Sequence, residues 1–218
     1  MTPQERKARS EKLITEKGIS ILTSLPMTEE ASQVKLRSLD EVCARAVAAL
    51  LSTQYAIELN EGHTAEAVTF AGLMAHFGVQ HKLNAKENRL VSGKASQQDI
   101  TDVVWEYECC WSLFWALGLV EDISDASQIC DCLQSIRFVS QTEGFEDFRS
   151  RCTLRSKDEI LDMLDLYYRY HWAVVQHEHI DPNCSVGDLN GEVVFERRRG
   201  LEWLISDTDD WYDISLDT

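Results

Sequence analysis

The chain of 218 residues carries 37 acidic and 21 basic residues, which gives a net charge of −16, and 44% of it is hydrophobic. This charge argues against a nucleic-acid-binding protein, because such affinity comes largely from neutralising phosphates. With only 3 prolines and 10 glycines, the composition is typical of a folded, helix-rich globule. The acidic surplus indicates either a merely solvated surface or electrostatic steering towards a basic partner.

The first elements in chain order are a charged helix and an apolar arm. Residues 4–17 predict the helix. Residues 18–26 predict an extended arm that lies across the core, because Pro26 disfavours helix at Leu25. Residues 1–20 are charged and lack the apolar segment of a secretory signal. We therefore expect a cytoplasmic protein whose seven cysteines are reduced.

A capping box marks the start of the next helix. Ser38 is followed three residues later by Glu41, the spacing at which the two residues bond each other's backbone N–H groups. This helix is expected to run to about Leu59, and another is expected over 64–77. The polar stretch 79–98 predicts an irregular loop.

The stretch 102–118 is apolar on nearly all sides and predicts a buried helix, capped by Ser96 or Thr101. Its unbroken apolar part is shorter than the roughly 20 residues of a membrane span, so no membrane association is expected. Gly118 stands where a left-handed residue would close the helix. We therefore predict a single all-α globular domain of about eight helices around this central helix.

Three further helices, and one helical turn at Phe145 and Phe148, are expected after the central one. A short helix capped by Asp125 would carry Ile129 and Leu133 on its apolar face. Two long helices are predicted over 156–176 and 191–205. None of this part of the chain shows the strict alternation of a strand.

The C-terminal segment, residues 207–218, combines acidic and apolar side chains. It carries five aspartates and no basic residue, yet also Tyr212, Ile214 and Leu216. So many large apolar side chains are unusual in a disordered tail, so we expect the segment to dock on the core. Its candidate partner-binding residues are Asp207, Asp209, Asp210, Trp211 and Asp213.

Several short phrases follow one another along nearly the whole chain, outside residues 60–96. They are Arg9-Ser10, Lys17-Gly18-Ile19, Leu25-Pro26, Leu36-Arg37-Ser38, Trp105 to Glu108, Trp115 to Leu119, Leu154-Arg155-Ser156, Tyr168 to Trp172, Glu196-Arg197-Arg198 and Trp211 to Thr218. Together they resemble the bacterial domain-of-unknown-function 4272 family. This resemblance implies a single cytosolic bacterial domain, and it brings no activity, substrate or catalytic residues.

Two glutamates lie in the central helix, where a charge needs a partner. Glu106 and Glu108 are two residues apart and point about 200° away from each other, so they cannot form an acid/base pair. Since an unpaired buried charge is costly, we predict an ion-pair cluster with Arg169, Arg197 and Arg198. The alternative is a ligand pocket built from the same region. Its candidate binding residues are Trp105, Glu108, Arg169, His171, Trp172, Arg197 and Arg198.

Motifs for catalysis and cofactor binding are missing from the sequence. It contains no nucleophile elbow, no phosphate-binding glycine loop and no dinucleotide fingerprint. We expect no cofactor and favour a protein that is not an enzyme. His177, His179, Asp181 and Cys184 are weak candidates for metal binding, but they lack a known ligand spacing, and no metal site is predicted.

Two classes of function stay open. The favoured one is a non-catalytic protein-binding module, similar to an immunity protein or antitoxin, whose acidic surface meets a basic protein. The alternative is an enzyme or small-molecule-binding protein with a pocket beside the central helix. That pocket would be lined by Trp105, Arg169, His171, Trp172 and Arg198.

Overall fold

The computed structural model describes residues 1–218, and all of its regular elements are helices. In chain order they are α1 (Pro3–Glu16), α2 (Leu39–Asn60), α3 (Thr64–His76), the 3-10 helix η1 (Gln80–Lys82), α4 (Ala85–Val91), α5 (Gln97–Ala116), α6 (Cys132–Ser140), α7 (Phe145–Ser150), α8 (Lys157–His179), α9 (Gly191–Trp203) and the 3-10 helix η2 (Trp211–Asp213). The all-α prediction is confirmed, with nine α-helices in place of about eight.

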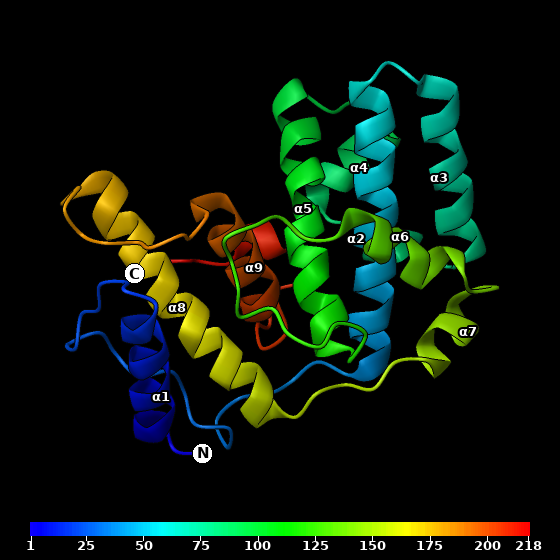
Figure 1. Cartoon of the computed structure of the whole chain (residues 1–218). Helices are drawn as coiled ribbons and strands as arrows, with labels where there is room; N and C mark the ends of the chain where they lie inside the picture. The colour runs from blue at the N-terminus through cyan, green and yellow to red at the C-terminus, as the bar shows by residue number, and fades with distance from the viewer.

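The helix α5 occupies the centre of the molecule. It packs on α2 along one side and on α9 along another, while α3 lies on the outer side of α2 (Figure 1). Every residue from Glu106 to Ala116 is buried, which confirms the prediction of a central helix apolar on nearly all sides. None of the helices combines the length and apolarity that a bilayer crossing requires.

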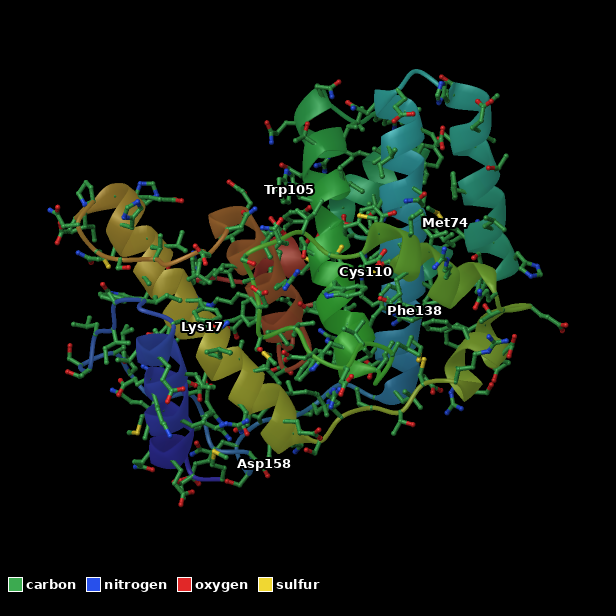
Figure 2. All side chains as sticks on the ribbon, in the orientation of Figure 1. Lys17, Met74, Trp105, Cys110, Phe138 and Asp158 are labelled. Carbon is green, nitrogen blue, oxygen red and sulfur yellow. The ribbon has the colours of Figure 1, made fainter.

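The helices α1 and α8 lie against each other at the opposite side of the molecule from α3 (Figure 1). Figure 2 shows Asp158 at the end of α8 that lies near the chain's N-terminus, and the amino group of Met1 is 3.2 Å from its carboxylate. The following arm, residues 18–26, buries Ile19 and Leu25. Lys7 of α1 donates to the carbonyl oxygen of Leu25 at 2.7 Å.

Short-range capping decides where two of the long helices begin. The capping box of Ser38 and Glu41 is present as predicted, and it begins α2. Ser96 and Asp99 form the same reciprocal bonds at the start of α5. The central helix therefore begins at Gln97 with Ser96 as its cap, one of the two caps predicted, and ahead of the apolar stretch 102–118.

Two glycines set how α5 ends and how closely α9 approaches it. Gly118 has φ +75° and closes α5, as its left-handed conformation was expected to do. On α9, a Cβ atom at Gly200 would lie 2.7 Å from the carbonyl oxygen of Cys109. Because glycine has no Cβ, the backbone of α9 lies directly on α5, and the arginines beside Gly200 reach the core.

The prediction of an irregular loop over 79–98 is wrong. The elements η1 and α4 lie between residues 80 and 91 of this stretch, and Asn84 caps α4 in a capping box with Glu87. Leu90, at the end of α4, is fully buried. A helix of only 7 residues carries too few apolar positions for its periodicity to stand out in a polar stretch.

The short helix expected after Asp125 begins later than predicted. Asp131 caps α6, and Ile129 and Leu133 are 59% and 65% exposed, so they do not form its buried face. The residues from Asp125 to Asp131 lack regular structure. Two of their backbone carbonyl groups, those of Asp125 and Gln128, accept instead from Arg197 of α9.

Candidate functional site

Glu108 and Arg197 form a buried ion pair between α5 and α9. The Nε atom of Arg197 donates to Oε2 of Glu108 at 2.8 Å, and neither side chain is more than 3% exposed. Arg197 also donates to the carbonyl oxygens of Asp125 at 2.6 Å and Gln128 at 3.1 Å. Glu108 accepts from the backbone N–H of Cys130 at 2.7 Å. The predicted pairing is confirmed for these two residues, and it fixes the loop between α5 and α6.

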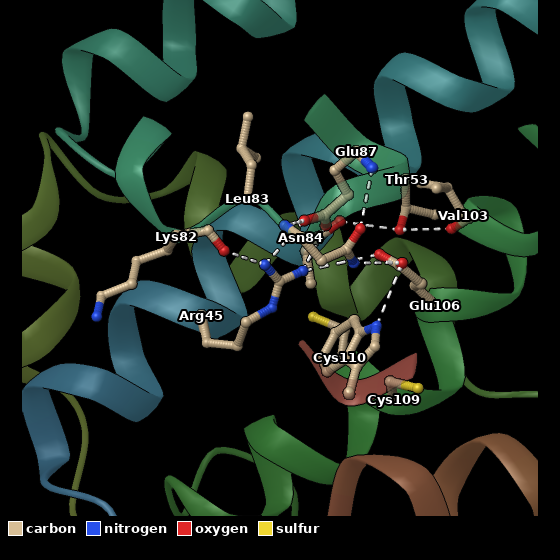
Figure 3. A network of polar contacts seen from close by, with 12 residues as sticks. Arg45, Thr53, Lys82, Leu83, Asn84, Glu87, Val103, Glu106, Cys109 and Cys110 are labelled. Carbon is tan, nitrogen blue, oxygen red and sulfur yellow. Dashed lines mark hydrogen bonds and ion pairs between the residues drawn. The ribbon is translucent and has the colours of Figure 1, made fainter. Parts of the chain in front are cut away.

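Glu106 belongs to a second buried cluster, between α5, α2 and α4 (Figure 3). Arg45 of α2 donates to both carboxylate oxygens of Glu87 and lies 3.7 Å from Oε2 of Glu106. The other oxygen of Glu106 accepts from Asn84 at 2.8 Å and from the indole of Trp211 at 3.3 Å. The prediction that Glu106 pairs with a C-terminal arginine is therefore wrong, because its side chain lies on the α2 side of α5.

This second cluster holds two carboxylates and one cation, and the two carboxylates differ in protonation. Burial and the charge of Glu87 raise the pKa of Glu106 well above its usual value. Burial would also raise the pKa of Glu87, but the Arg45 guanidinium lowers it below its usual value. A neutral Glu106 accounts for its Oε2 atom, which accepts no hydrogen bond. That oxygen can carry the proton and donate a hydrogen bond to the Glu87 carboxylate.

Arg169 is paired within its own helix and not with α5, so its predicted pairing with the central glutamates is wrong. It binds both oxygens of Asp165 at 2.9 Å and donates to the carbonyl oxygen of Pro26 at 3.2 Å. Asp165 is fully buried and Arg169 is 2% exposed. These bonds hold the end of the N-terminal arm on α8.

Arg169→Ala is expected to lower the free energy of unfolding by about 3 kcal/mol, because it leaves the carboxylate of Asp165 buried without a cation. For a chain of this size the melting temperature should then fall by about 6–12 °C. A thermal melt followed by circular dichroism measures the change. Arg9→Ala on the surface of α1 serves as the control, and an unchanged melt of Arg169→Ala would exclude a structural role.

Arg198 connects α9 to α8 and to the C-terminal segment, again without contacting the glutamates of α5. It donates to Nδ1 of His171 at 2.6 Å and to the carbonyl oxygens of Leu216 and Asp217 at 3.0 and 3.1 Å. Burial and the neighbouring charge of Arg198 lower the pKa of His171 to about 4. The imidazole is therefore neutral at pH 7 and accepts the hydrogen bond.

His171 gives the protein a pH-dependent stability. Because its pKa is lowered on folding from about 6.5, the unfolded chain binds more protons between these two values, and stability is lost as the pH falls from about 6.5 to about 4. His171→Asn, which keeps an acceptor, should remove about 1–3 kcal/mol of this loss. Urea denaturation across that range measures it, with the exposed His179→Asn as control. An identical pH dependence in His171→Asn and the wild type would contradict the assignment.

The predicted ligand-binding residues do not line a common cavity. Trp105 and Trp172 are half-buried on α5 and α8, while the arginines and His171 are packed into the clusters described above. None of the seven predicted residues lines any of the five principal cavities. The largest of these five, of about 380 Å³, lies elsewhere, between α1, α8 and the loop after α5, and its lining includes Arg9, Ser10 and Arg155.

The weak metal candidates are not brought together. The helix α8 continues to His179, beyond the polar turn expected there, so His177 and His179 diverge on a helix. His177 binds the carbonyl oxygen of Cys184 at 2.9 Å, while Asp181 lies exposed in the following turn. A different group has its ligand atoms within 4.8 Å of one another, at the exposed end of α2. It consists of Glu58, Glu61 and His63.

The C-terminal segment presents its carboxylates to solvent and its aromatic side chain to the core. Asp207, Asp209 and Asp213 are exposed and Asp210 is half-buried. Trp211 is only 1% exposed and stacks on Arg45, 4.2 Å from its guanidinium carbon. Trp211 thus anchors the segment from inside, so the prediction that it contacts a partner is wrong, while the aspartates around it form an ordered acidic surface.

The interior and the exterior of the protein differ sharply in charge balance. Five arginines and six carboxylates are buried, namely Arg6, Arg45, Arg169, Arg197 and Arg198 against Glu87, Asp99, Glu106, Glu108, Asp165 and Glu196. Of the 21 basic and 37 acidic residues, this leaves 16 and 31 outside the core. Nearly the whole excess negative charge therefore lies on the surface, where it can act on other molecules.

Comparison with known proteins gives one match. The model of a family described as a domain of unknown function, DUF4272, matches residues 6–214. No curated protein and no solved structure matches the chain.

Proposed function

We propose that this chain, which belongs to the DUF4272 family, is a non-catalytic binding module whose acidic surface recognises a basic protein. The observation that carries the proposal is the sorting of charge between interior and exterior. The buried arginines are all engaged with carboxylates or carbonyl groups inside the protein, and 31 acidic residues face only 16 basic ones outside the core. Such a surface attracts cationic partners and accelerates their encounter.

The C-terminal segment is the part of this surface best prepared for binding. Trp203 donates to the carbonyl oxygen of Asp209 at 3.0 Å, and Arg37 donates to that of Thr208. Since the backbone is held in this way, Asp207 and Asp209 need little ordering on association, which favours affinity. These two aspartates border a hollow of about 190 Å³, which is also lined by Lys35, Arg37 and Glu41. Asp209 pairs with Arg37 at 3.4 Å, whereas Asp207 forms no ion pair within the protein.

An immunity- or antitoxin-like role fits this arrangement, because such proteins act by covering a target and not by chemistry. The seven cysteines are all free, and six of them are buried. Unpaired cysteines in this number suit the reducing conditions of a cytoplasm. We therefore place the proposed encounter there.

The test is co-purification from the native host at low salt, with elution by a salt gradient and identification by mass spectrometry. The wild type should retain a basic protein that elutes as the salt rises. The triple variant Asp207→Asn, Asp209→Asn, Asp213→Asn should lose it. The triple variant Glu61→Gln, Glu66→Gln, Glu178→Gln removes the same charge at other exposed sites and should keep it. Equal recovery by both variants, or no basic partner at all, would refute the proposal.

A further inference from the structure

Three side chains with metal-binding groups meet at the turn between α2 and α3, at one end of the molecule (Figure 1). Glu58 belongs to the last turn of α2, Glu61 follows the last residue of that helix, and His63 directly precedes α3. One ligand atom from each of the three lies within 4.8 Å of the other two. Imidazole nitrogen and carboxylate oxygen are both ligands that zinc takes in proteins.

The backbone of the turn brings these side chains together. The N–H of His63 donates to the carbonyl oxygen of Glu58 at 2.8 Å, and the N–H of Gly62 donates to that of Leu59 at 3.1 Å. Gly62 has φ +83°, the left-handed conformation that glycine adopts without strain. These two bonds form a common helix ending that turns the chain back over the last turn of the helix. The imidazole is therefore held beside the carboxylate of α2 before any ligand binds.

The distances within this group match those between the ligands of a single ion. The Nδ1 atom of His63 is 3.0 Å from Oε2 of Glu58 and 3.5 Å from Oε2 of Glu61. Ligand atoms placed tetrahedrally at about 2.1 Å from a zinc ion lie about 3.4 Å from one another. The two separations lie on either side of this value, so an ion needs only a small shift of the side chains.

The charge of the group also favours a divalent cation. No lysine or arginine pairs with Glu58 or Glu61, and both carboxylates have only the imidazole of His63 as a partner. A protonated imidazole balances one of the two negative charges, and a neutral imidazole balances neither. The side chain of Glu58 is 27% exposed and those of Glu61 and His63 are more than half exposed. An ion can therefore reach the group from solvent without any opening of the fold.

We propose that Glu58, Glu61 and His63 form a binding site for a divalent transition-metal ion such as Zn²⁺. Two ligands come from the end of α2 and one from the start of α3, which packs on α2. The ion therefore links the two helices and stabilises their contact. Mg²⁺ and Ca²⁺ do not suit the site, because they take oxygen ligands and one of the three ligands here is nitrogen.

Zinc titration of the full chain without a histidine tag, in competition with a chromophoric chelator, tests this site. The wild type should bind one ion at this site with a dissociation constant below about 0.1 mM. His63→Ala and Glu58→Gln should each weaken binding about tenfold or more. Zinc should raise the melting temperature of the wild type and should raise that of the two variants less. An equal concentration of Mg²⁺ should not displace the zinc.

The matched control is His179→Ala, which should bind zinc like the wild type. His179 is 70% exposed and lies 3.9 Å from Glu178, but it has no second carboxylate beside it. His63→Ala should fold, because the His63 side chain makes no capping bond to α3. The site is refuted if zinc binds more weakly than about 0.1 mM, if Mg²⁺ displaces it, or if His63→Ala binds it as tightly as the wild type.

The zinc site and the partner-binding surface can fail independently. The variant Glu61→Gln, Glu66→Gln, Glu178→Gln should keep the basic partner, yet it should bind zinc more weakly because one ligand is lost. The variant Asp207→Asn, Asp209→Asn, Asp213→Asn should lose the partner and bind zinc like the wild type.

Discussion

Arg197→Met is expected to lower the free energy of unfolding by at least about 4 kcal/mol. The substitution leaves the carboxylate of Glu108 buried without its cation, and it removes the donors that bind the carbonyl oxygens of Asp125 and Gln128. Those carbonyl groups belong to a segment without regular structure, so no helix or sheet bond can replace the lost partners. The melting temperature should fall by about 8 °C or more.

Urea denaturation of the variant, compared with Arg137→Met, measures this effect. Arg137 is exposed and forms no ion pair, and its replacement should change stability by no more than about 0.5 kcal/mol. Adding Glu108→Gln to Arg197→Met should restore part of the loss, because the unpaired charge is then gone. If Arg197→Met costs less than about 1 kcal/mol, the ion pair does not organise the loop as described.

The variants Glu87→Gln and Glu106→Gln should differ strongly in their free energy of unfolding, although both remove a buried carboxylate beside Arg45. Glu87→Gln removes the anion that binds Arg45 directly and should cost about 3 kcal/mol. Glu106→Gln keeps the acceptor for Asn84 and Trp211 and places an amide donor where the proton of neutral Glu106 lies. At about pH 8 it should be neutral or stabilising.

The pH dependence separates this interpretation from a simple ion pair. The pKa of Glu106 is raised on folding, so above about pH 4.5 the native protein binds a proton that the unfolded chain releases, and stability falls as the pH rises. Glu106→Gln lacks this titration, so its stability relative to the wild type should increase with pH. Urea denaturation at several pH values tests it. A Glu106→Gln variant that is destabilised equally at all pH values would show that Glu106 is ionised in the native state.

Local signals accounted for much of the fold. The capping box at Ser38, the apolar surface of the central helix and the closing Gly118 each depend on residues within one or two turns, and each was predictable from the sequence. That Glu108 needs a cation was also predictable, because a carboxylate buried in a core helix is costly without one, but which of the three candidate arginines supplies it was not. These inferences need no knowledge of how distant segments meet.

Partnerships between distant segments were not predictable in the same way. Arg45 lies in an alanine-rich helix, and nothing near it in the sequence shows that Glu106, in another helix, lies beside it. The cavity lined by Arg9, Ser10 and Glu121 likewise forms only where α1, α8 and a loop come together. Arg9 and Ser10 were part of the family resemblance, but the sequence does not show that they lie beside Glu121 of the loop after α5. The acidic surplus was evident from composition, whereas the burial of Trp211 required the structure.

The central claim is that exposed carboxylates of the C-terminal segment steer a basic partner. It is tested most directly by the association rate constant of the captured partner, measured by stopped-flow between about 0.05 and 0.5 M salt. For the wild type and for the Glu61→Gln, Glu66→Gln, Glu178→Gln control, the rate constant should fall steeply with salt. For the Asp207→Asn, Asp209→Asn, Asp213→Asn variant, the rate constant should be lower at low salt and should decrease less as the salt concentration rises. The same salt dependence in all three proteins would contradict the account.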